Sequence, residues 1–389
     1  MKTLLVFAPE QQRLPDAEQQ RREAADEVPH HSLLEESLNA DVVDHQYIQE
    51  WRSRSLFTRL FYKLLPLSLL QALIVYGLRR RYDVVVSWDD RFALFYAFLL
   101  TITRSRSRYV ALLSWMAQPK KAFVLKLLQN AIDRIVVWSQ THTDLLTEFW
   151  QISPERLVMV AYPVDHHFWR PMNEVADSIS SAGNSRRDYA TLIEAVRGLD
   201  IRCNIATTVK LAQAGNPDWN ATGRSLSQIS SLPDNVVCKA SSLAEMRAMY
   251  ARSRFVVVPL FPSFRDNGIT IVNQAMAMGK AVICSRIQGQ IEFVEEGVTG
   301  ILVPPADVQA LREAIQYLWD HPDVAEQMGR EGRRRAEEIF ALTQFVADIQ
   351  QVVDDVIKGN RTFIPTIAER MRTLSKPIGQ KPVKEISSN

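Results

Sequence analysis

The residues with the clearest chemical potential lie between two apolar strands in the second half of the chain. Phe255–Leu260 is predicted to be a buried strand, a polar loop follows it, and a helix is expected from about Thr270 to Gly279. A second apolar strand is predicted at 281–284. A strand, helix and strand in so few residues predict a βαβ unit of a parallel sheet, where ligands bind beyond the carboxyl ends of the strands.

The loop before this helix has the composition of an anion site. Gly268 lets the backbone approach a ligand closely. The first N–H groups of the helix, from Ile269 to Val272, have no partner within it and carry about half a positive elementary charge of helix dipole. We therefore expect Gly268, Ile269 and Thr270 to face an anion. An ordinary crossover with a surface loop is the alternative, and the residues alone do not decide between the two.

The stretch 262–282 resembles the donor-binding motif of the retaining glycosyltransferases of family 4, also called group 1. That motif reads roughly Pro-Ser-x-x-Glu-Gly-x-Gly-x-x-x-x-Glu-Ala-Met-Ala-x-Gly-x-Pro-Val, and both Pro262-Ser263 and 275–282 match it closely. The two family glutamates, eight residues apart, fall on Asp266 and Gln274. The resemblance implies that Asp266 contacts the donor sugar with a side chain shorter than the family glutamate. It also implies that Gln274, which is uncharged, accepts a hydrogen bond from the ribose.

Arg186 and Arg187 form a second candidate for anion binding. They lie in Asn184–Ala195, which resembles the family segment whose arginine and lysine hold the donor pyrophosphate. Arg187 falls on the lysine position and Asn184 on the arginine position, so Arg186 is expected to substitute for that arginine. Two adjacent guanidiniums at a strand-to-helix turn suit a diphosphate because each can bind oxygens through two N–H groups. A solvated Arg-Arg-Asp surface turn is the alternative.

The resemblance also implies where the nucleotide base binds. Ser242 and Glu245 form a capping box that is expected to open a helix. In the family, the turn before this helix binds the base through backbone groups, which makes Lys239 and Ala240 candidates. The complete donor site expected from the sequence is Arg186, Arg187, Lys239, Ala240, Asp266, Asn267, Gly268, Ile269, Thr270 and Gln274.

Asp89 and Asp90 are the candidates for catalysis in the first half of the chain. They follow a predicted strand at 82–87, and a carboxylate at the end of a strand can position an acceptor hydroxyl or accept its proton. Capping of the helix expected from Phe92 explains either residue equally well. With Arg187 and Asp266 they form the expected catalytic set. No Asp-x-Asp sequence occurs and no histidine has the setting of a metal ligand, so no metal site is expected.

Length and composition predict a globular protein of two domains. The 389 residues are 47% apolar and 23% charged, and the net charge of +2 gives no overall attraction to nucleic acid. Strands and helices alternate, which predicts doubly wound parallel sheets of the α/β class. Three isolated cysteines indicate a reducing compartment, and no apolar run reaches the roughly 18 residues of a membrane span, so a cytoplasmic location is expected.

The resemblance implies the GT-B architecture, with two Rossmann-like domains that face an interdomain cleft. We expect an N-terminal acceptor domain at 1–171 and a C-terminal nucleotide-sugar donor domain at 172–345. A helix at 346–358 is expected to cross back to the first domain, and 359–389 to form a basic, partly disordered tail.

The segment 51–81 has an unusual charge pattern, with seven basic residues and no acidic one. Leu56, Phe57, Leu60, Phe61 and Leu64 recur at helical spacing beside basic positions. Such a helix can lie in a membrane interface, which predicts peripheral contact with an anionic membrane surface on the inner face of the plasma membrane. A core helix with a basic outer face is the alternative, and 67–78 is expected to be largely core. The basic residues are Arg52, Arg54, Arg59, Lys63, Arg79, Arg80 and Arg81.

The resemblance implies retaining, metal-independent transfer of a hexose from a UDP- or GDP-sugar, without a cofactor, to a glycan or lipid-linked acceptor in envelope polysaccharide or glycolipid synthesis. The changes at Asp266 and Gln274, and the absence of any glycine before Gly77 where the family has a Gly-Gly loop, leave a non-catalytic GT-B protein that binds a nucleotide or glycan as the alternative. A sugar-nucleotide epimerase is a weaker alternative because it needs acid–base groups flanking the sugar. The absence of Gly-x-Gly-x-x-Gly argues against a dinucleotide dehydrogenase.

Overall fold

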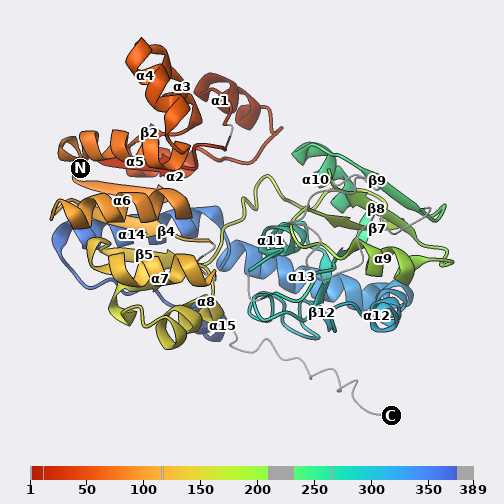
Figure 1. The fold of residues 1–389 in the computed structure, drawn as a ribbon. Coiled ribbons are helices and arrows are strands. Elements are labelled where there is room, and N and C mark those ends of the chain that lie inside the picture. Colours follow the sequence, from red (N-terminus) through yellow and green to blue (C-terminus); the bar gives the residue numbers. More distant parts are fainter. Residues whose placement is uncertain are drawn as a thin grey trace. The chain divides into compact units, whose positions relative to one another are not determined.

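The computed structural model describes residues 2–11, 13–114, 116, 118–208, 232–263 and 266–374. These residues form two compact units (Figure 1). Unit 1 comprises Met1–Ala161 and Leu342–Ile364, and unit 2 comprises Tyr162–Ala341 and the described residues from Pro365 onward. The last part of the expected basic tail, 375–389, lies outside the described residues.

Unit 1 is built on a six-stranded sheet in the order β2-β1-β3-β4-β5-β6, and every neighbouring pair is parallel. The central strands are apolar along their whole length because helices cover both faces of such a sheet. The strands are β1 (Thr3–Phe7), β2 (Ala40–Val43), β3 (Val84–Trp88), β4 (Arg108–Leu112), β5 (Arg134–Val137) and β6 (Leu157–Met159). The helices are α1 (Asp16–Ala24), α2 (Leu33–Leu38), α3 (His45–Ser53), α4 (Leu56–Leu64), α5 (Leu67–Leu78), α6 (Asp90–Ile102), α7 (Pro119–Leu128), α8 (Gln140–Asp144) and α14 (Leu342–Lys358).

Unit 2 contains a second parallel sheet of six strands, in the order β12-β11-β10-β7-β8-β9. The chain starts in the middle at β7, adds β8 and β9 on one side, and then adds β10 to β12 on the other. The strand order therefore reverses between β7 and β10, and in doubly wound sheets ligands bind beyond the carboxyl ends of the strands at this point. The strands are β7 (Ser178–Ala182), β8 (Arg202–Ala206), β9 (Val236–Lys239), β10 (Ser253–Val258), β11 (Ala281–Ser285) and β12 (Gly300–Val303).

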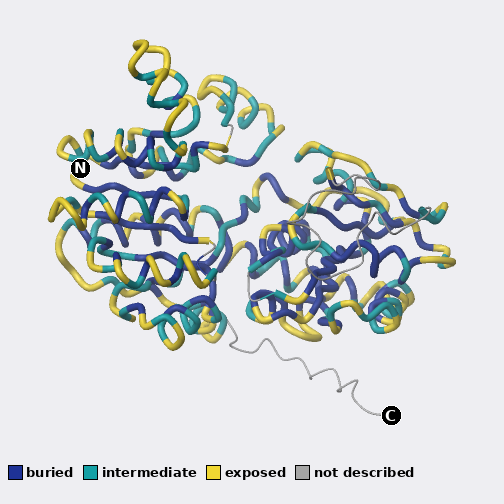
Figure 2. Tube along the Cα trace, in the orientation of Figure 1, coloured by how far each residue is buried: buried dark blue, intermediate teal, exposed yellow. Residues whose placement is uncertain are grey.

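The helices of unit 2 pack closely enough to position the loop that precedes α11. A Cβ atom at Gly329 of α13 would lie 2.1 Å from the carbonyl oxygen of Gly279, and one at Gly332 would lie 3.0 Å from Cγ of Met276. Only glycine lets α13 press on α11 and on the turn after it. Figure 2 shows the strands and inner helix faces of this unit as buried. The helices are α9 (Tyr189–Val196), α10 (Leu243–Ala251), α11 (Ile269–Ala277), α12 (Val308–Asp320), α13 (Pro322–Glu338) and α15 (Ile367–Leu374).

The segment 51–81 forms separate short helices rather than one long helix. Helix α3 ends at Ser53, and Ser55 opens α4 through a capping box, in which its Oγ accepts from Thr58 N at 3.1 Å and its N–H donates to Thr58 Oγ1 at 3.0 Å. The expected core position of 67–78 is confirmed, since Leu70, Ala72 and Val75 of α5 are buried. By contrast α4 has no buried residue (Figure 2). Within the described ranges, no helix combines the length and apolar character that crossing a bilayer requires.

Candidate functional site

The loops that follow β7 and β10 are joined to each other by backbone hydrogen bonds. Asp188 N donates to Pro259 O at 3.0 Å, and Phe261 N donates to Arg186 O at 3.1 Å. Because β7 and β10 are neighbours at the reversal of strand order, the two loops form one continuous structure at the carboxyl edge of the sheet. The structure thus brings together the two segments that the sequence singled out separately.

Arg187 has a half-buried side chain, and no carboxylate among the described residues pairs with its guanidinium. Its Nε donates to Ala182 O at 2.9 Å and its Nη1 to Ser185 O at 2.8 Å, while Nη2 has no hydrogen bond within the described part of the chain. Nη2 lies against Gly183, where a Cβ atom would come within 2.7 Å of it and where φ is +101°. Burial lowers the pKa of Arg187, yet an arginine stays charged at neutral pH. A fixed positive charge with an unused donor is suited to an anion.

Arg186 connects the loop after β7 to the loop after β10. Its Nη2 donates to Pro262 O at 2.7 Å, and its backbone lies in the left-handed region with φ +55°. Asn184, at the position of the family arginine, accepts hydrogen bonds from Thr207 Oγ1 at 2.8 Å and Thr208 N at 2.9 Å. Arg186 and Asn184 thus connect the β7 loop to the loops on either side of it. A direct contact of Arg186 with a ligand stays a prediction.

Asn267 and Gly268 hold the loop that leads into α11. Asn267 is buried, its Nδ2 donates to Ser263 Oγ at 2.9 Å, and its carbonyl accepts from Gln290 Nε2 at 2.6 Å. Gly268 has φ +94°, and a Cβ atom there would lie 3.1 Å from Cγ1 of Val258. The loop therefore requires glycine both for its backbone conformation and for its contact with β10.

The unpaired amides of α11 are fewer than the sequence predicted. The helix begins at Ile269, and the N–H groups of Ile271 and Val272 both donate to Gly268 O, at 2.9 and 3.0 Å. Within the described residues, the backbone N–H groups without an acceptor at this helix end are therefore those of Ile269 and Thr270. Gly268 O therefore accepts hydrogen bonds from two of the four N–H groups that were expected to bind an anion.

Gln274 contains an unsatisfied acceptor inside unit 2. The residue is 8% exposed, and its Oε1 is buried without a hydrogen-bond partner among the described residues. The adjacent Asn273 also has a buried Oδ1 without a partner among the described residues, but its Nδ2 donates to Tyr162 O at 2.8 Å. A buried acceptor without a donor costs about 1–3 kcal/mol, so its presence needs an explanation. A ligand hydroxyl would supply the missing donor.

The remaining donor-site candidates are placed as follows. Asp266 is half-buried and lies directly before Asn267. Lys239 ends β9, is exposed, pairs with Glu245 Oε1 at 3.7 Å, and has its carbonyl engaged by Thr207 N at 3.0 Å. Ala240 follows it and is exposed. Because β9 lies two strands from β7, Lys239 and Ala240 are roughly 10 Å along the sheet edge from the loop that contains Arg187. One nucleotide can span this distance with its diphosphate at Arg187 and its base near Lys239 and Ala240.

The two aspartates of unit 1 both serve structural roles. Asp89 caps α6, with Oδ1 accepting from Phe92 N at 2.6 Å, and burial raises its pKa. Asp90, the first helical residue, is buried and accepts from Ser114 N at 3.0 Å and from Lys121 Nζ at 3.3 Å. The helix thus begins two residues before the expected Phe92. Capping is confirmed for Asp89, and a catalytic role for either carboxylate stays a prediction.

His142 was not identified from the sequence and is the most unusual polar residue of unit 1. It lies in α8 directly after β5, is 6% exposed, and both of its ring nitrogens lack a partner among the described residues. Burial lowers its pKa to about 4. The sequence feature that could have located His142 is Ser139. Its Oγ caps the helix by accepting from His142 N at 3.1 Å, which places the histidine in the first turn.

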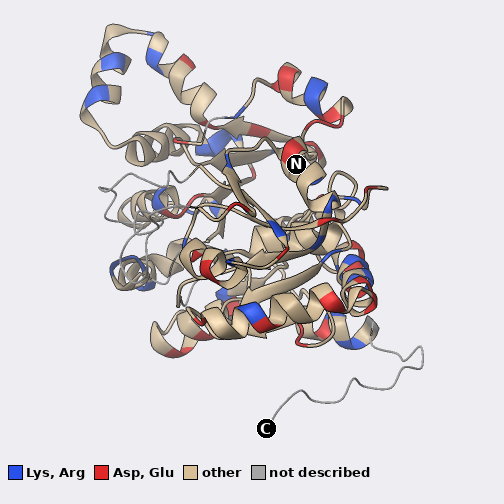
Figure 3. Ribbon diagram, turned by 90° about the vertical axis from the view of Figure 1, so that its right-hand side faces the viewer, with Lys and Arg blue, Asp and Glu red and all other residues tan. Residues whose placement is uncertain are grey.

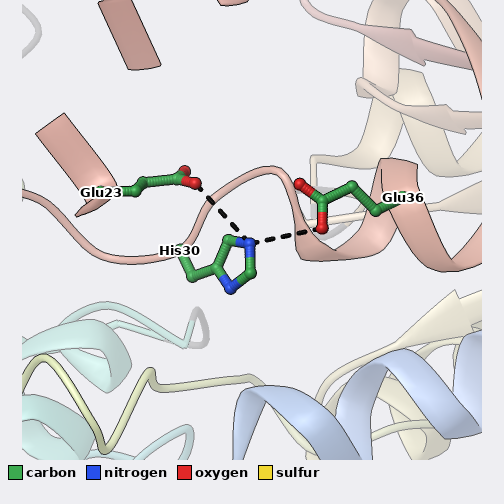
Figure 4. Close-up of side chains that lie close together, drawn as sticks. All are labelled: Glu23, His30 and Glu36. Carbon is green, nitrogen blue, oxygen red and sulfur yellow. Dashed lines mark ion pairs between the residues drawn. The ribbon is translucent and has the colours of Figure 1, made fainter. Parts of the chain in front are cut away.

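A cluster near α1 and α2 has side chains that can bind metal. His30 Nε2 lies 3.6 Å from Glu23 Oε2 and 3.4 Å from Glu36 Oε2, and Figure 4 shows the imidazole between the two carboxylates. Glu23 also accepts from Ser32 Oγ at 2.8 Å, so its carboxylate already orders the turn between the helices. We therefore assign a structural role to this cluster, which is to stabilise the turn between α1 and α2.

Comparison with known proteins agrees with this geometry. Residues 179–321 match the family model described as Glycosyl transferases group 1. A curated relative, the MMP alpha-(1->4)-mannosyltransferase of Mycolicibacterium hassiacum, is 28% identical over 272 residues, which are 66% of this chain and 64% of the relative. The D-rhamnosyltransferase WbpZ of Pseudomonas aeruginosa is 39% identical over 85 residues, 21% of this chain and 22% of its own. The chain thus spans less than two thirds of the length of either relative.

Solved structures of low sequence identity share the fold. Alr3699/HepE of Anabaena, in complex with UDP-glucose, superposes with a TM-score of 0.66 at 15% identity, over 91% of this chain and 100% of its own. The sucrose-phosphate synthase of Thermosynechococcus elongatus gives 0.68 at 16% identity, over 92% and 100%. Two parallel six-stranded sheets with flanking helices confirm the expected GT-B fold. Over residues 179–321, the chain is therefore similar to the glycosyl transferases of group 1.

Proposed function

We propose that this protein is a retaining, metal-independent glycosyltransferase that moves a hexose from a UDP- or GDP-sugar to a glycan or lipid-linked acceptor. The observation that carries the proposal is Arg187, a half-buried guanidinium without a carboxylate partner among the described residues, at the reversal point of the unit 2 sheet. The mannosyl- and rhamnosyltransferase names of two relatives, and the UDP-glucose in the HepE structure, support the same chemistry.

The proposed catalysis rests on stabilising the leaving group. As the glycosidic bond of a nucleotide sugar breaks, negative charge develops on the diphosphate. Arg187 lies in the loop after β7, and the N–H groups of Ile269 and Thr270, which have no acceptor among the described residues, lie at the start of α11. Hydrogen bonds within the protein already hold both segments in place. Donors that need no rearrangement stabilise developing charge more effectively than water does.

The sugar and the acceptor would be held by the remaining candidates. Asp266 would accept hydrogen bonds from hydroxyl groups of the donor sugar, and Gln274 Oε1 would accept one from the ribose. The acceptor hydroxyl would attack from the face that the nucleotide leaves, and its proton would pass to the departing phosphate. Asp89 and Asp90 remain the candidates for the acceptor side, although both carboxylates already bond to the protein.

The direct test is a turnover assay on the full chain. The protein is incubated with a panel of UDP-, GDP- and ADP-sugars, with and without bacterial lipid extract, and free nucleotide is measured. We expect release from one class of donor and an increase when the extract supplies an acceptor. Tight nucleotide-sugar binding without release under any condition would favour the non-catalytic GT-B alternative, for which the lost charge at Gln274 is the specific reason. No binding to any donor would contradict both.

Gln274→Leu separates ligand binding from stability. Loss of the acceptor should weaken UDP binding by about tenfold, as for one hydrogen bond. Removal of a buried oxygen without a donor should raise the free energy of unfolding by about 1 kcal/mol. Calorimetric titration and urea unfolding measure the two quantities.

The neighbouring Asn273→Leu is the matched control for Gln274→Leu. Its amide donates to Tyr162 O, so this variant should be less stable than the wild type. A Gln274→Leu variant that loses stability while keeping its affinity for UDP would show that Oε1 has no role in binding the nucleotide.

A further inference from the structure

Helix α4 exposes an apolar face that nothing in unit 1 covers. Leu56, Phe57, Leu60 and Leu64, which we call the α4 face, are 81%, 68%, 51% and 69% exposed. Large apolar side chains gathered at this exposure on a short helix are uncommon on a monomeric globular domain and mark an interaction surface.

Basic side chains surround the α4 face. Arg59 and Lys63 lie on the helix itself, are exposed, and pair with no carboxylate within the described part of the chain. The guanidinium of Arg52 lies over the ring of Tyr62 at 4.7 Å, and that of Arg54 over Tyr47 at 5.8 Å. Figure 3 shows Lys and Arg but no Asp or Glu along this helix.

This local charge contrasts with the chain as a whole. Residues 51–132 contain fourteen Lys and Arg against three Asp and no Glu, whereas the whole protein has a net charge of only +2. Positive charge therefore strongly outweighs negative charge over the stretch of sequence that includes the α4 face. A partner that complements this surface must combine negative charge with apolar material.

A cavity beside α4 is also mainly apolar and has a basic residue in its wall. Its volume is about 370 Å³, and it is lined by residues of α3, α4 and α5, including Trp51, Phe57, Phe61, Leu70, Ile74 and Arg54. Phe57 belongs both to the cavity wall and to the α4 face, so the two apolar surfaces are continuous. One basic group beside an otherwise apolar cavity suits the chain and headgroup region of an anionic amphiphile.

We propose that the α4 face docks on an anionic phospholipid bilayer, with α4 parallel to the membrane plane. Its apolar side chains would enter the region between headgroups and acyl chains, while Arg52, Arg54, Arg59 and Lys63 contact lipid phosphates. The nine residues of α4 are too few to cross a bilayer, which is consistent with a peripheral position. An anionic bilayer provides both the charge and the apolar interior that this surface needs. The inference depends on unit 1 alone and not on the proposed function.

Vesicle co-sedimentation of the full chain tests this proposal. The vesicles consist of phosphatidylcholine alone or of phosphatidylcholine mixed with phosphatidylglycerol. One variant carries Arg52→Gln, Arg54→Gln, Arg59→Gln and Lys63→Gln, and another carries Leu56→Ser, Phe57→Ser, Leu60→Ser and Leu64→Ser. The matched control carries Arg202→Gln, Arg252→Gln, Arg286→Gln and Arg330→Gln, four exposed arginines of unit 2.

The wild type should sediment with the mixed vesicles and much less with phosphatidylcholine alone. Both α4 variants should bind at least about tenfold more weakly, because each cation at an anionic surface and each inserted side chain contributes to affinity. The control should change by less than about twofold, since its charges are far from the apolar face in sequence and belong to the other unit. Circular dichroism and UDP binding confirm that each variant is folded, and they separate a failure here from a failure of the proposed function.

Four results would overturn the proposal. The first is failure to recover the wild type with mixed vesicles, and the second is sedimentation of the α4 variants equal to that of the wild type. Equal loss of binding in the unit 2 control would show that net charge, and not this face, is responsible. Self-association of the wild type in sedimentation velocity, abolished by the serine variant, would instead assign the α4 face to an interface between copies.

Discussion

Replacing Arg187 with methionine is expected to weaken the binding of UDP by about 100-fold. Methionine keeps the apolar part of the side chain and removes the guanidinium, whose hydrogen bonds to a diphosphate are each expected to contribute about 1.5–3 kcal/mol. Arg187 lies half-buried against Gly183, and no carboxylate among the described residues competes for its charge. Isothermal titration with UDP and with GDP measures the loss.

Three further variants make this result specific. Arg197→Met removes an exposed arginine that pairs with Glu194 at 2.9 Å on the surface of the same unit, and it should leave the affinity for UDP unchanged. Asp89→Ala changes unit 1 and should also have little effect on nucleotide binding. The affinity of Arg186→Met for UDP shows whether this guanidinium contacts the ligand or only stabilises the loop through its bond to Pro262 O. Equal losses in Arg187→Met and Asp89→Ala would contradict the assignment of the nucleotide to unit 2.

The second large effect concerns the pH dependence of stability through His142. Burial lowers the pKa of this imidazole in the folded protein to about 4, below its ordinary 6.5, so the folded state keeps it neutral. Above about pH 6.5 it makes no difference to stability, because the ring is neutral in both states. As the pH falls from 6.5 towards 4, the unfolded chain binds a proton that the folded chain does not. The free energy of unfolding should therefore fall over this window, by about 3 kcal/mol at most.

His142→Leu should remove this loss. Urea titrations between pH 4 and 7.5, followed by tryptophan fluorescence, measure the difference between the variant and the wild type at each pH. This difference isolates His142 from groups that titrate in the opposite sense, such as Glu35, whose pKa is raised to about 7 by burial. Asp90 is the nearby charged group that opposes the shift at His142. The exposed His167→Leu is the control, and parallel curves for His142→Leu and the wild type would contradict the prediction.

Features that depend on local sequence were predictable. The alternation of apolar strands and helices predicted two parallel sheets, because the period of a strand or helix is visible in a short window. The capping box at Ser242 and Glu245 is confirmed, with Ser242 N donating to Glu245 Oε2 at 2.7 Å. The sequence also singled out Gly268 at the start of α11, and its φ of +94° is a backbone conformation that few other residues adopt.

Features that depend on contacts between distant segments were not predictable. The two adjacent arginines looked equivalent, but they differ because Arg186 reaches Pro262 O, 76 residues away, while Arg187 folds over Gly183. His142 became unusual only when the surrounding elements buried it without a partner. The apolar stripe of α4 was visible in the sequence, whereas its exposure follows from the packing of α5 in the core instead.

The sequence by itself determined the fold class and singled out two candidate segments, a glycine-led helix end and a pair of arginines, because backbone preference and helix or strand period are properties of neighbouring residues. Only the tertiary structure decided which donors and acceptors remain unused among the described residues, and these include Arg187 Nη2, the amides of Ile269 and Thr270, and Gln274 Oε1. The physical reason is that a polar group is satisfied or left unsatisfied by all the segments packed around it, and these segments are far apart along the chain.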